Sequence, residues 1–180
     1  MDSTIQVKDK KFEIFISSEA IDAAVTKIAD SMNKELQDKD PLFLIILNGA
    51  FMFAADLLKK ITVDCSLSFV KLASYSGTKS TNVVKELIGL NEKIEGRSVI
   101  VIEDIIDTGQ TLEVLLELLK KYNAASVQIA TLLFKPEAFK GNYKIDYVGM
   151  DIPNDFIIGY GLDYDGYARN LPDIYKIVSN

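Results

Sequence analysis

Two short, continuous runs of apolar residues, 42–47 (LFLIIL) and 99–102 (VIVI), constrain the fold most. Neither run alternates with polar residues, which is typical of a strand buried on both faces of a parallel sheet. A helical pattern follows each of them, at 51–60 and at about 111–122. Strands that alternate with helices in this way predict an α/β domain around a mostly parallel sheet.

Further elements surround this centre. A helix is predicted to begin after Ser17, whose hydroxyl can cap the first turn, and to run to about Met32. Strand patterns recur at 64–72, 83–90 and 126–133. The small, polar residues at 73–82 predict an excursion between two antiparallel strands, which is a flap. Beyond Pro136 the pattern weakens into short pieces, from which we expect a cap or hood over the sheet.

No internal repeat, low-complexity tract or linker divides the sequence. Its 180 residues and 20.0 kDa fall in the usual range for one domain, about 100–200 residues. We therefore expect a single domain over residues 1–180. The hood would be formed by the N-terminal segment and about 136–180, and the flap by about 73–85.

The composition limits the possible chemistry. There is no histidine, which excludes Ser-His-Asp and Cys-His nucleophiles and His-ligated zinc. The single cysteine, Cys65, excludes an intramolecular disulfide, and its place in an alternating stretch predicts that it packs as a small apolar residue. Acid–base catalysis must therefore come from Asp, Glu, Lys or Tyr. A bound metal would be a hard cation held by oxygen.

The net charge of −6 argues against a general electrostatic grip on nucleic acid. No apolar run approaches the roughly 20 residues needed to span a bilayer. The first residues carry neither the basic region nor the apolar core of a signal peptide. We therefore expect no nucleic-acid or membrane partner and a cytoplasmic location.

The strand at 99–102 is followed by the densest group of candidate site residues. Ligands of open α/β sheets bind beyond the carboxyl ends of the strands. Here Thr108, Gly109, Gln110 and Thr111 lead directly into a helix. Their backbone N–H groups, two hydroxyls and the positive end of the helix suit a phosphate group. Gly109 also allows the ligand to approach the backbone closely.

Three acidic residues, Glu103, Asp104 and Asp107, precede this anion site and would repel a bare phosphate. At about 4 Å and an effective dielectric constant near 20, each such contact costs about 4 kcal/mol. The conflict disappears if the ligand also brings sugar hydroxyls and Mg²⁺, since carboxylates bind both. A phosphorylated ribose fits this strip, whereas the alternative is an ordinary helix start with solvated acids.

The stretch 101–112 (VIEDIIDTGQTL) resembles the phosphoribosyl-pyrophosphate signature of type I phosphoribosyltransferases, and most closely their 6-oxopurine branch, the hypoxanthine-guanine phosphoribosyltransferases. The similarity extends from the 47–50 turn to Asn170. It implies a type I phosphoribosyltransferase fold: a central, mostly parallel sheet flanked by helices, with a small hood and a flexible antiparallel flap. It also implies a homodimer or homotetramer.

The activity implied by the resemblance is purine salvage. Phosphoribose would pass from phosphoribosyl pyrophosphate to hypoxanthine, and to guanine, giving IMP or GMP and pyrophosphate with Mg²⁺ present. Glu103 and Asp104 would hold the ribose hydroxyls, in part through the metal. Asp107 would be the general base at purine N7. The turn from Asp107 to Thr111 would bind the 5′-phosphate.

The resemblance also implies a purine-binding set. Lys135 would donate to the 6-oxo group, which an ammonium suits because it can only donate hydrogen bonds. Phe156 would stack on the base, and the backbone of Ile157 would meet the edge of the purine. Asp163 would lie on this side of the site and help to hold Mg²⁺ near the pyrophosphate.

The pyrophosphate set implied by the family is Asn48, Gly49 and Arg169. Family members commonly have Leu-Lys-Gly where this chain has Leu47-Asn48-Gly49, so a positive charge is lost here. The backbone contact does not need the side chain. The resemblance also predicts a cis Leu47–Asn48 peptide bond.

Ser74 and Tyr75 match the closing flap of the family. Because the transition state resembles an oxocarbenium ion, which water would capture, a flap that excludes water has a clear purpose.

Two other functions remain open on the residues. One is a regulator of the same fold that binds RNA and senses nucleotides, which would need a basic face. The other is an enzyme of the same fold that acts on adenine, orotate or uracil, which Lys135 and the stretch 156–163 disfavour.

Overall fold

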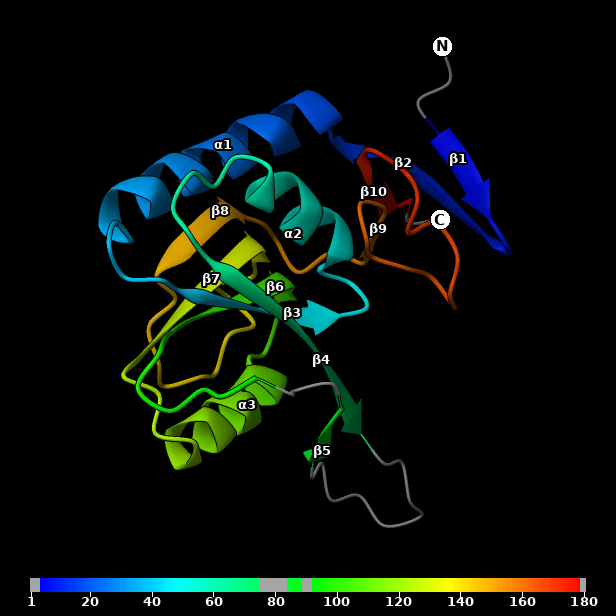
Figure 1. Cartoon of the computed structure of the whole chain (residues 1–180). Helices are drawn as coiled ribbons and strands as arrows, with labels where there is room; N and C mark the ends of the chain where they lie inside the picture. Colours follow the sequence, from blue (N-terminus) through cyan, green and yellow to red (C-terminus); the bar gives the residue numbers. More distant parts are fainter. Residues whose placement is uncertain (1–3, 75–83, 89–91, 179–180) are drawn as a thin grey trace.

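The computed structural model describes residues 4–74, 84–88 and 92–178. A large sheet has the strand order β5-β4-β3-β6-β7-β8 (Figure 1). Five neighbouring strands, β4, β3, β6, β7 and β8, pair in parallel. At one edge, β5 pairs antiparallel with β4. The strands are β3 (Leu42–Leu47), β4 (Ser66–Ser74), β5 (Val84–Ile88), β6 (Ser98–Ile106), β7 (Ser126–Phe134) and β8 (Tyr147–Asp151).

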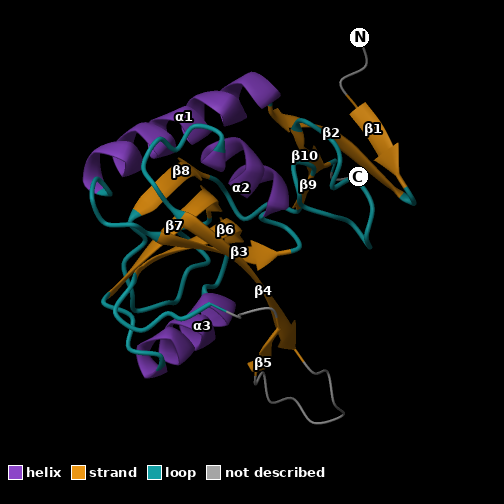
Figure 2. Cartoon of the chain, in the orientation of Figure 1, coloured by secondary structure: helices purple, strands orange, loops and turns teal. Residues whose placement is uncertain are grey.

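Helices cover both faces of this sheet. α1 (Ser18–Glu35) and α2 (Phe51–Leu58) lie on one face, and α3 (Gln110–Lys121) lies on the other (Figure 2). Alternate residues of β3 therefore join different cores: Phe43 and Ile45 pack with α1 and α2, whereas Leu44 packs with α3. This is why the run at 42–47 is apolar throughout.

A smaller antiparallel sheet forms the hood, with the order β1-β2-β10-β9. It has its own apolar cluster around Phe12, Ile158 and Tyr175. Both ends of the described chain contribute to it, so the termini lie on the same side of the molecule (Figure 1). Its strands are β1 (Thr4–Val7), β2 (Lys10–Ile16), β9 (Ile157–Ile158) and β10 (Ile174–Ile177).

The range expected for the hood, 136–180, starts too early. Within it, β8 pairs in parallel with β7 and belongs to the large sheet, with Thr131 opposite Val148. The sequence of β8 is short and carries no helical pattern around it, so it did not signal a further parallel strand. The hood begins only with the segment that leads into β9.

β6 is longer than predicted, and β4 has the predicted length but lies two residues further along the chain. β6 continues to Ile106, because its residues pair with β7 as far as Ile106 opposite Phe134, so Glu103 and Asp104 lie on the strand itself. β4 continues to Ser74, where β5 returns antiparallel to it, which confirms the two strands of the flap. Tyr75 and the tip of the flap lie outside the described residues.

The expectation that Cys65 packs in the interior is wrong. Cys65 is exposed, because the inward-facing residues of β4 are Ser68 and Val70, whereas Cys65, just before the strand, is in phase with the exposed side chains of Leu67 and Phe69. Among the helices in the described ranges, none is both long and apolar enough to cross a lipid bilayer.

Candidate active site

Two adjoining cavities open beyond the carboxyl ends of β3, β6 and β7. The first, here called the loop cavity, has a volume of about 310 Å³ and is lined by the end of β3, residues 103–109 and the start of α3. The second, the hood cavity, measures about 300 Å³ and lies against Lys135, residues 155–157 and Arg169. Asp104, Ile105 and Asp107 line both cavities, so the end of β6 is their common wall.

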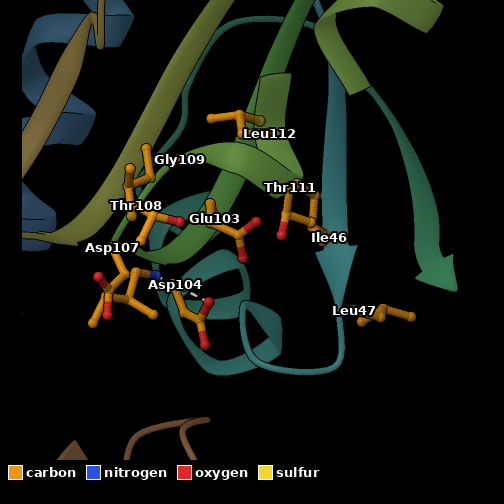
Figure 3. Close-up of a pocket in the computed structure, with 11 residues that line it drawn as sticks. Ile46, Leu47, Glu103, Asp104, Asp107, Thr108, Gly109, Thr111 and Leu112 are labelled. Carbon is orange, nitrogen blue, oxygen red and sulfur yellow. Dashed lines mark hydrogen bonds between the residues drawn. The ribbon is translucent and has the colours of Figure 1, made fainter. Parts of the chain in front are cut away.

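The loop 107–111 connects β6 to α3 and forms one side of the loop cavity (Figure 3). Gly109 precedes the helix with φ +80, a left-handed conformation that favours glycine. A Cβ there would lie 2.5 Å from the Tyr143 hydroxyl oxygen, so the position is also crowded. No side chain caps α3, and its first N–H groups are therefore free for a ligand in the described structure.

Glu103 and Asp104 lie next to each other on β6, and Figure 3 shows their carboxylates beside the loop. Burial raises the pKa of Glu103 well above its usual value, and the neighbouring charge of Asp104 raises it further. Burial also raises the pKa of Asp104, although Glu103, the Ile105 N–H at 2.9 Å and the charge of Arg169 oppose that shift. The two carboxylates therefore resist simultaneous ionisation until a cation or hydrogen-bond donors arrive.

These oxygen donors fit Mg²⁺, which is bound by one or two carboxylates together with water and substrate oxygens. No group of three or more carboxylate, histidine or cysteine ligands is found within the described ranges. Asp163, the third predicted metal ligand, lines the hood cavity together with Asp104. A cation here would therefore need oxygens from its substrate.

Lys135 and Asp107 form an ion pair, with 3.0 Å between Nζ and Oδ2. The pairing of Ile106 with Phe134 at the ends of β6 and β7 places the next residue of each strand side by side. Lys135 is only 7% exposed and has a second, weaker contact of 3.4 Å to Asn154 Oδ1. The result is a buried donor beside a half-exposed acceptor, at the junction of the cavities.

The hood contributes a second ion pair. Arg169 Nη2 lies 2.5 Å from Asp163 Oδ1, and Arg169 Nη1 donates to the carbonyl of Gly161 at 2.7 Å. The other oxygen of Asp163 accepts from the Gly166 N–H.

The turn between β3 and α2 lies against the Asp104 carboxylate. A Cβ on Gly49 would lie 1.8 Å from Asp104 Oδ2, so only glycine allows this close contact.

Phe156 is 46% exposed and lines the hood cavity. Its ring packs on the hood against Phe12, at 6.3 Å between centroids, and edge-on against Tyr164, at 5.8 Å. Ile157 is buried beside it and also lines the cavity. An aromatic ring fixed on one side and open on the other is suited to stacking on a planar ligand.

Apart from the flap pair, the predicted site residues meet at these two cavities, with two exceptions. Asn48 is exposed and Gln110 is exposed, and neither side chain lines a cavity. The Leu47–Asn48 peptide bond is cis, as predicted. Of the flap pair, Ser74 is the last residue of β4.

Several lining residues were not predicted. They lie next to predicted residues at the ends of strands or in the hood, and are Ile46, Leu47, Ile105, Ile106, Leu112, Asp155 and Leu162. The aromatic residues that support the loop from outside, Phe139 and Tyr143, were also missed. The one sequence signal that could have indicated these two residues is that they follow Lys135 closely in the sequence.

Comparison with known proteins explains this arrangement. The phosphoribosyl transferase domain family matches residues 16–165. A hypoxanthine-guanine phosphoribosyltransferase of Bacillus subtilis (strain 168) is 42% identical over 163 residues, which cover 90% of this chain and 91% of the relative. This chain belongs to the hypoxanthine-guanine phosphoribosyltransferases, within the type I phosphoribosyltransferase family. The similarity to this family seen in the sequence is thereby confirmed.

Other relatives agree. A hypoxanthine-guanine phosphoribosyltransferase of Streptococcus thermophilus (strain CNRZ 1066) is 45% identical over 166 residues, covering 92% of each chain. A crystal structure of a hypoxanthine phosphoribosyltransferase from Staphylococcus aureus superimposes with a TM-score of 0.83 at 37% identity and covers 92% of both chains. The expected α/β fold with a parallel sheet and a small antiparallel hood is therefore confirmed.

Proposed function

We propose that this purine-salvage phosphoribosyltransferase converts hypoxanthine and guanine to IMP and GMP, with Asp107 and Lys135 reading the purine edge. The observation that supports this most is the 3.0 Å pair itself, an acceptor next to a buried donor. In a 6-oxopurine, the N7–H donor and the O6 acceptor are neighbours on one edge, so they complement this pair. Adenine presents an amino group where Lys135 needs an acceptor.

Asp107 is proposed to act as the general base. As the purine nitrogen bonds to C1′ of the ribose, pyrophosphate leaves and the ring loses the proton on N7. The Asp107 carboxylate lies where the two cavities meet, and it is the proposed acceptor of that proton. With no histidine in the sequence, a carboxylate is the available base that is ionised at neutral pH.

The loop cavity is the proposed site of the ribose 5-phosphate part of phosphoribosyl pyrophosphate. The 107–111 loop offers N–H groups to the phosphate, while Glu103 and Asp104 accept hydrogen bonds from the ribose hydroxyls. Mg²⁺, when bound, would neutralise these acids and the pyrophosphate. Glu103 and Asp104 would hold it on the ribose side, and Asp163 on the pyrophosphate side.

The positions of the side chains support the remaining proposed roles. The Arg169 guanidinium and the backbone at Gly49 line the side of the hood cavity where pyrophosphate is proposed to bind. Phe156 would stack on the purine, with Ile157 at its edge. The flap, expected at about 73–85 with Ser74 and Tyr75, is proposed to close over the donor and exclude water. Asn48 is retained only as a backbone contact, because its side chain is exposed.

A homodimer or homotetramer is also proposed, in a cytoplasmic location. Leu67 and Phe69 lie on one face of β4 and are 43% and 48% exposed, and Phe51 at the start of α2 is 42% exposed. A second subunit would cover such apolar side chains. Sedimentation analysis should give a mass at least twice 20.0 kDa, and a monomer would contradict this proposal.

One assay tests the function as a whole. The protein is incubated with Mg²⁺, phosphoribosyl pyrophosphate and one nucleobase at a time: hypoxanthine, guanine, xanthine, adenine, uracil or orotate. We expect IMP from hypoxanthine and GMP from guanine, and no product when Mg²⁺ is removed with a chelator. Formation of AMP, UMP or orotidylate in preference to IMP would overturn the assignment of Lys135.

A further inference from the structure

The 107–111 loop is bound from outside by the segment that follows β7. This segment donates three hydrogen bonds, two to carbonyl groups of the loop and one to the carbonyl of Ile106, the residue just before it. The Lys135 N–H donates to Ile106 at 3.0 Å, the Lys140 N–H to Thr108 at 3.1 Å, and the Tyr143 hydroxyl to Gly109 at 2.8 Å. Of the three, only the last comes from a side chain.

These bonds determine where the loop N–H groups point. In a trans peptide the carbonyl and the following N–H point in opposite directions. Carbonyls held on the outside at Thr108 and Gly109 therefore turn the N–H groups of Gly109 and Gln110 towards the loop cavity. Among the hydrogen bonds found in the described ranges, none is donated by these two N–H groups.

The Gly109 carbonyl is fully engaged. It accepts from the Glu113 N–H at 3.1 Å, the first bond of α3, as well as from Tyr143. Burial raises the pKa of Tyr143 to about 12, and the charges of Glu113 and Glu103 add to this effect. The hydroxyl therefore remains a donor across the physiological range.

Aromatic packing fixes the hydroxyl in place. The Tyr143 ring meets Phe139 edge-on at 5.2 Å, and Phe139 meets Phe134 edge-on at 5.3 Å. Gly109 and Gly141 both lie against these rings: a Cβ on either would come within 2.6 Å of Phe139. Tyr143 is thus attached through its ring to the end of β7, and through its hydroxyl to the loop.

We propose that Tyr143 is a positioning residue for phosphate binding: its hydroxyl, by holding the Gly109 carbonyl, aims the loop N–H groups at the 5′-phosphate. This inference rests on the proposed binding of ribose 5-phosphate in the loop cavity. Tyr143 itself does not line that cavity, so it acts through the loop and not on the ligand.

The test is Tyr143→Phe, which keeps the ring packing and removes only the hydroxyl. We expect the dissociation constant for ribose 5-phosphate, measured by calorimetry, and the KM for phosphoribosyl pyrophosphate to rise about 3- to 10-fold, the size expected for one hydrogen bond. The KM for hypoxanthine should stay within about twofold. Tyr147→Phe is the matched control: its hydroxyl is bonded to Glu35 at 2.8 Å, on β8 away from both cavities. It should leave both phosphate measurements unchanged.

An unchanged affinity for ribose 5-phosphate in Tyr143→Phe, with IMP still formed, would overturn the inference and leave the proposed function intact. If Tyr143→Phe binds ribose 5-phosphate more weakly but the unsubstituted protein forms no IMP, the inference is supported and the proposed function is overturned. A second measurement needs no variant. Ribose 5-phosphate should shift the amide resonances of Gly109 and Gln110 in the unsubstituted protein, and unmoved resonances would contradict the inference.

Discussion

The two cavities are built in different ways. The loop cavity is formed mainly by one continuous stretch, 103–112, with the end of β3 beside it. The hood cavity takes its lining from residues that are far apart in the sequence, among them Gly49, Asp107, Lys135 and Arg169. The loop offers chiefly backbone groups to a ligand, whereas the hood cavity offers charged and aromatic side chains.

This difference predicts different sensitivities to substitution. A backbone site tolerates changes of side chain but not changes of main-chain conformation, because its donors are N–H groups. A side-chain site loses a specific contact with each substitution, and the loss should affect one part of the substrate. Asp107 is an exception, since it lines both cavities, as Asp104 and Ile105 also do, and is the one among them that is proposed to take part in proton transfer.

The largest effect is expected at this shared residue. Asp107→Asn keeps the size of the side chain but cannot accept the N7 proton. Turnover should fall by about 10²- to 10⁴-fold, the usual contribution of a general base. The dissociation constant for ribose 5-phosphate should change little, because the loop N–H groups remain. Steady-state kinetics measures the turnover, and calorimetry measures the dissociation constant for ribose 5-phosphate.

The control for this variant is Asp151→Asn, at the exposed end of β8 and away from both cavities. It should behave as the unsubstituted protein. Turnover of Asp107→Asn close to that of this control would remove the general base from the mechanism and leave the two cavities with no shared catalytic group.

The hood cavity can be tested alone with Lys135→Met. This substitution keeps an apolar stem and removes the donor to the 6-oxo group. A hydrogen bond to a charged group contributes about 1.5–3 kcal/mol, so the KM for hypoxanthine should rise about 10- to 150-fold. The KM for phosphoribosyl pyrophosphate should rise far less.

The matched control is Lys144→Met, an exposed lysine paired with Asp146. If Lys135→Met raised both KM values equally, the separation of the two cavities by ligand would be wrong.

The same difference explains what the sequence could predict. The loop cavity was found because its residues are contiguous, and because an acidic strand end before a Thr-Gly-Gln-Thr turn has few structural uses. In the hood cavity, spacing within the sequence did not bring together Gly49, Lys135 and Arg169, and their roles came from the resemblance to a family. The roles of the individual residues remain predictions.

Some features depended on tertiary packing and could not be predicted. β8 joined the large sheet because its short apolar piece completes the edge beside β7, where pairing adds backbone hydrogen bonds. Glu103 and Asp104 lie on a strand and not in a turn because β7 extends the pairing to Ile106. Tyr143 was missed because its hydroxyl bonds to the Gly109 carbonyl, 34 residues earlier in the chain, and a contact over that separation leaves no pattern in the sequence.

The conformational sensitivity of the loop can be tested with Gly109→Ala. The left-handed conformation costs a residue with a Cβ about 1–2 kcal/mol, and crowding against Tyr143 and Phe139 adds about 1–3 kcal/mol. At about 2–4 °C per kcal/mol for a chain of this size, Tm should fall by roughly 4–20 °C. Affinity for ribose 5-phosphate should fall as well.

Gly96→Ala separates the two contributions. Gly96 has φ +74 but no atom within 4 Å of where a Cβ would lie. Gly96→Ala should therefore lose only the conformational contribution to the free energy of unfolding, about 1–2 kcal/mol. Its affinity for ribose 5-phosphate should be unchanged. Equal losses of Tm in the two variants would show that Phe139 and Tyr143 yield to the added methyl group, and that the loop is less rigid than its packing indicates.

The smallest effect concerns Glu103, which with Asp104 forms the acidic lining of the loop cavity. The pKa of Glu103 is raised in the folded protein, so the folded state holds a proton that the unfolded chain releases near pH 4.5. The free energy of unfolding should therefore fall as pH rises above that value, until Glu103 is ionised in both states. Glu103→Gln removes this loss, so its Tm without ligands should exceed that of the unsubstituted protein by a few degrees at pH 8 and by less at pH 4.

The exposed Glu137→Gln is the control and should show no such difference. Mg²⁺ with phosphoribosyl pyrophosphate should raise the Tm of the unsubstituted protein more than that of Glu103→Gln, since the variant has lost one of the charges that the cation neutralises. A Tm advantage that does not depend on pH would mean that the acids are accommodated by the fold alone, and that the loop cavity does not need a cation to complete it.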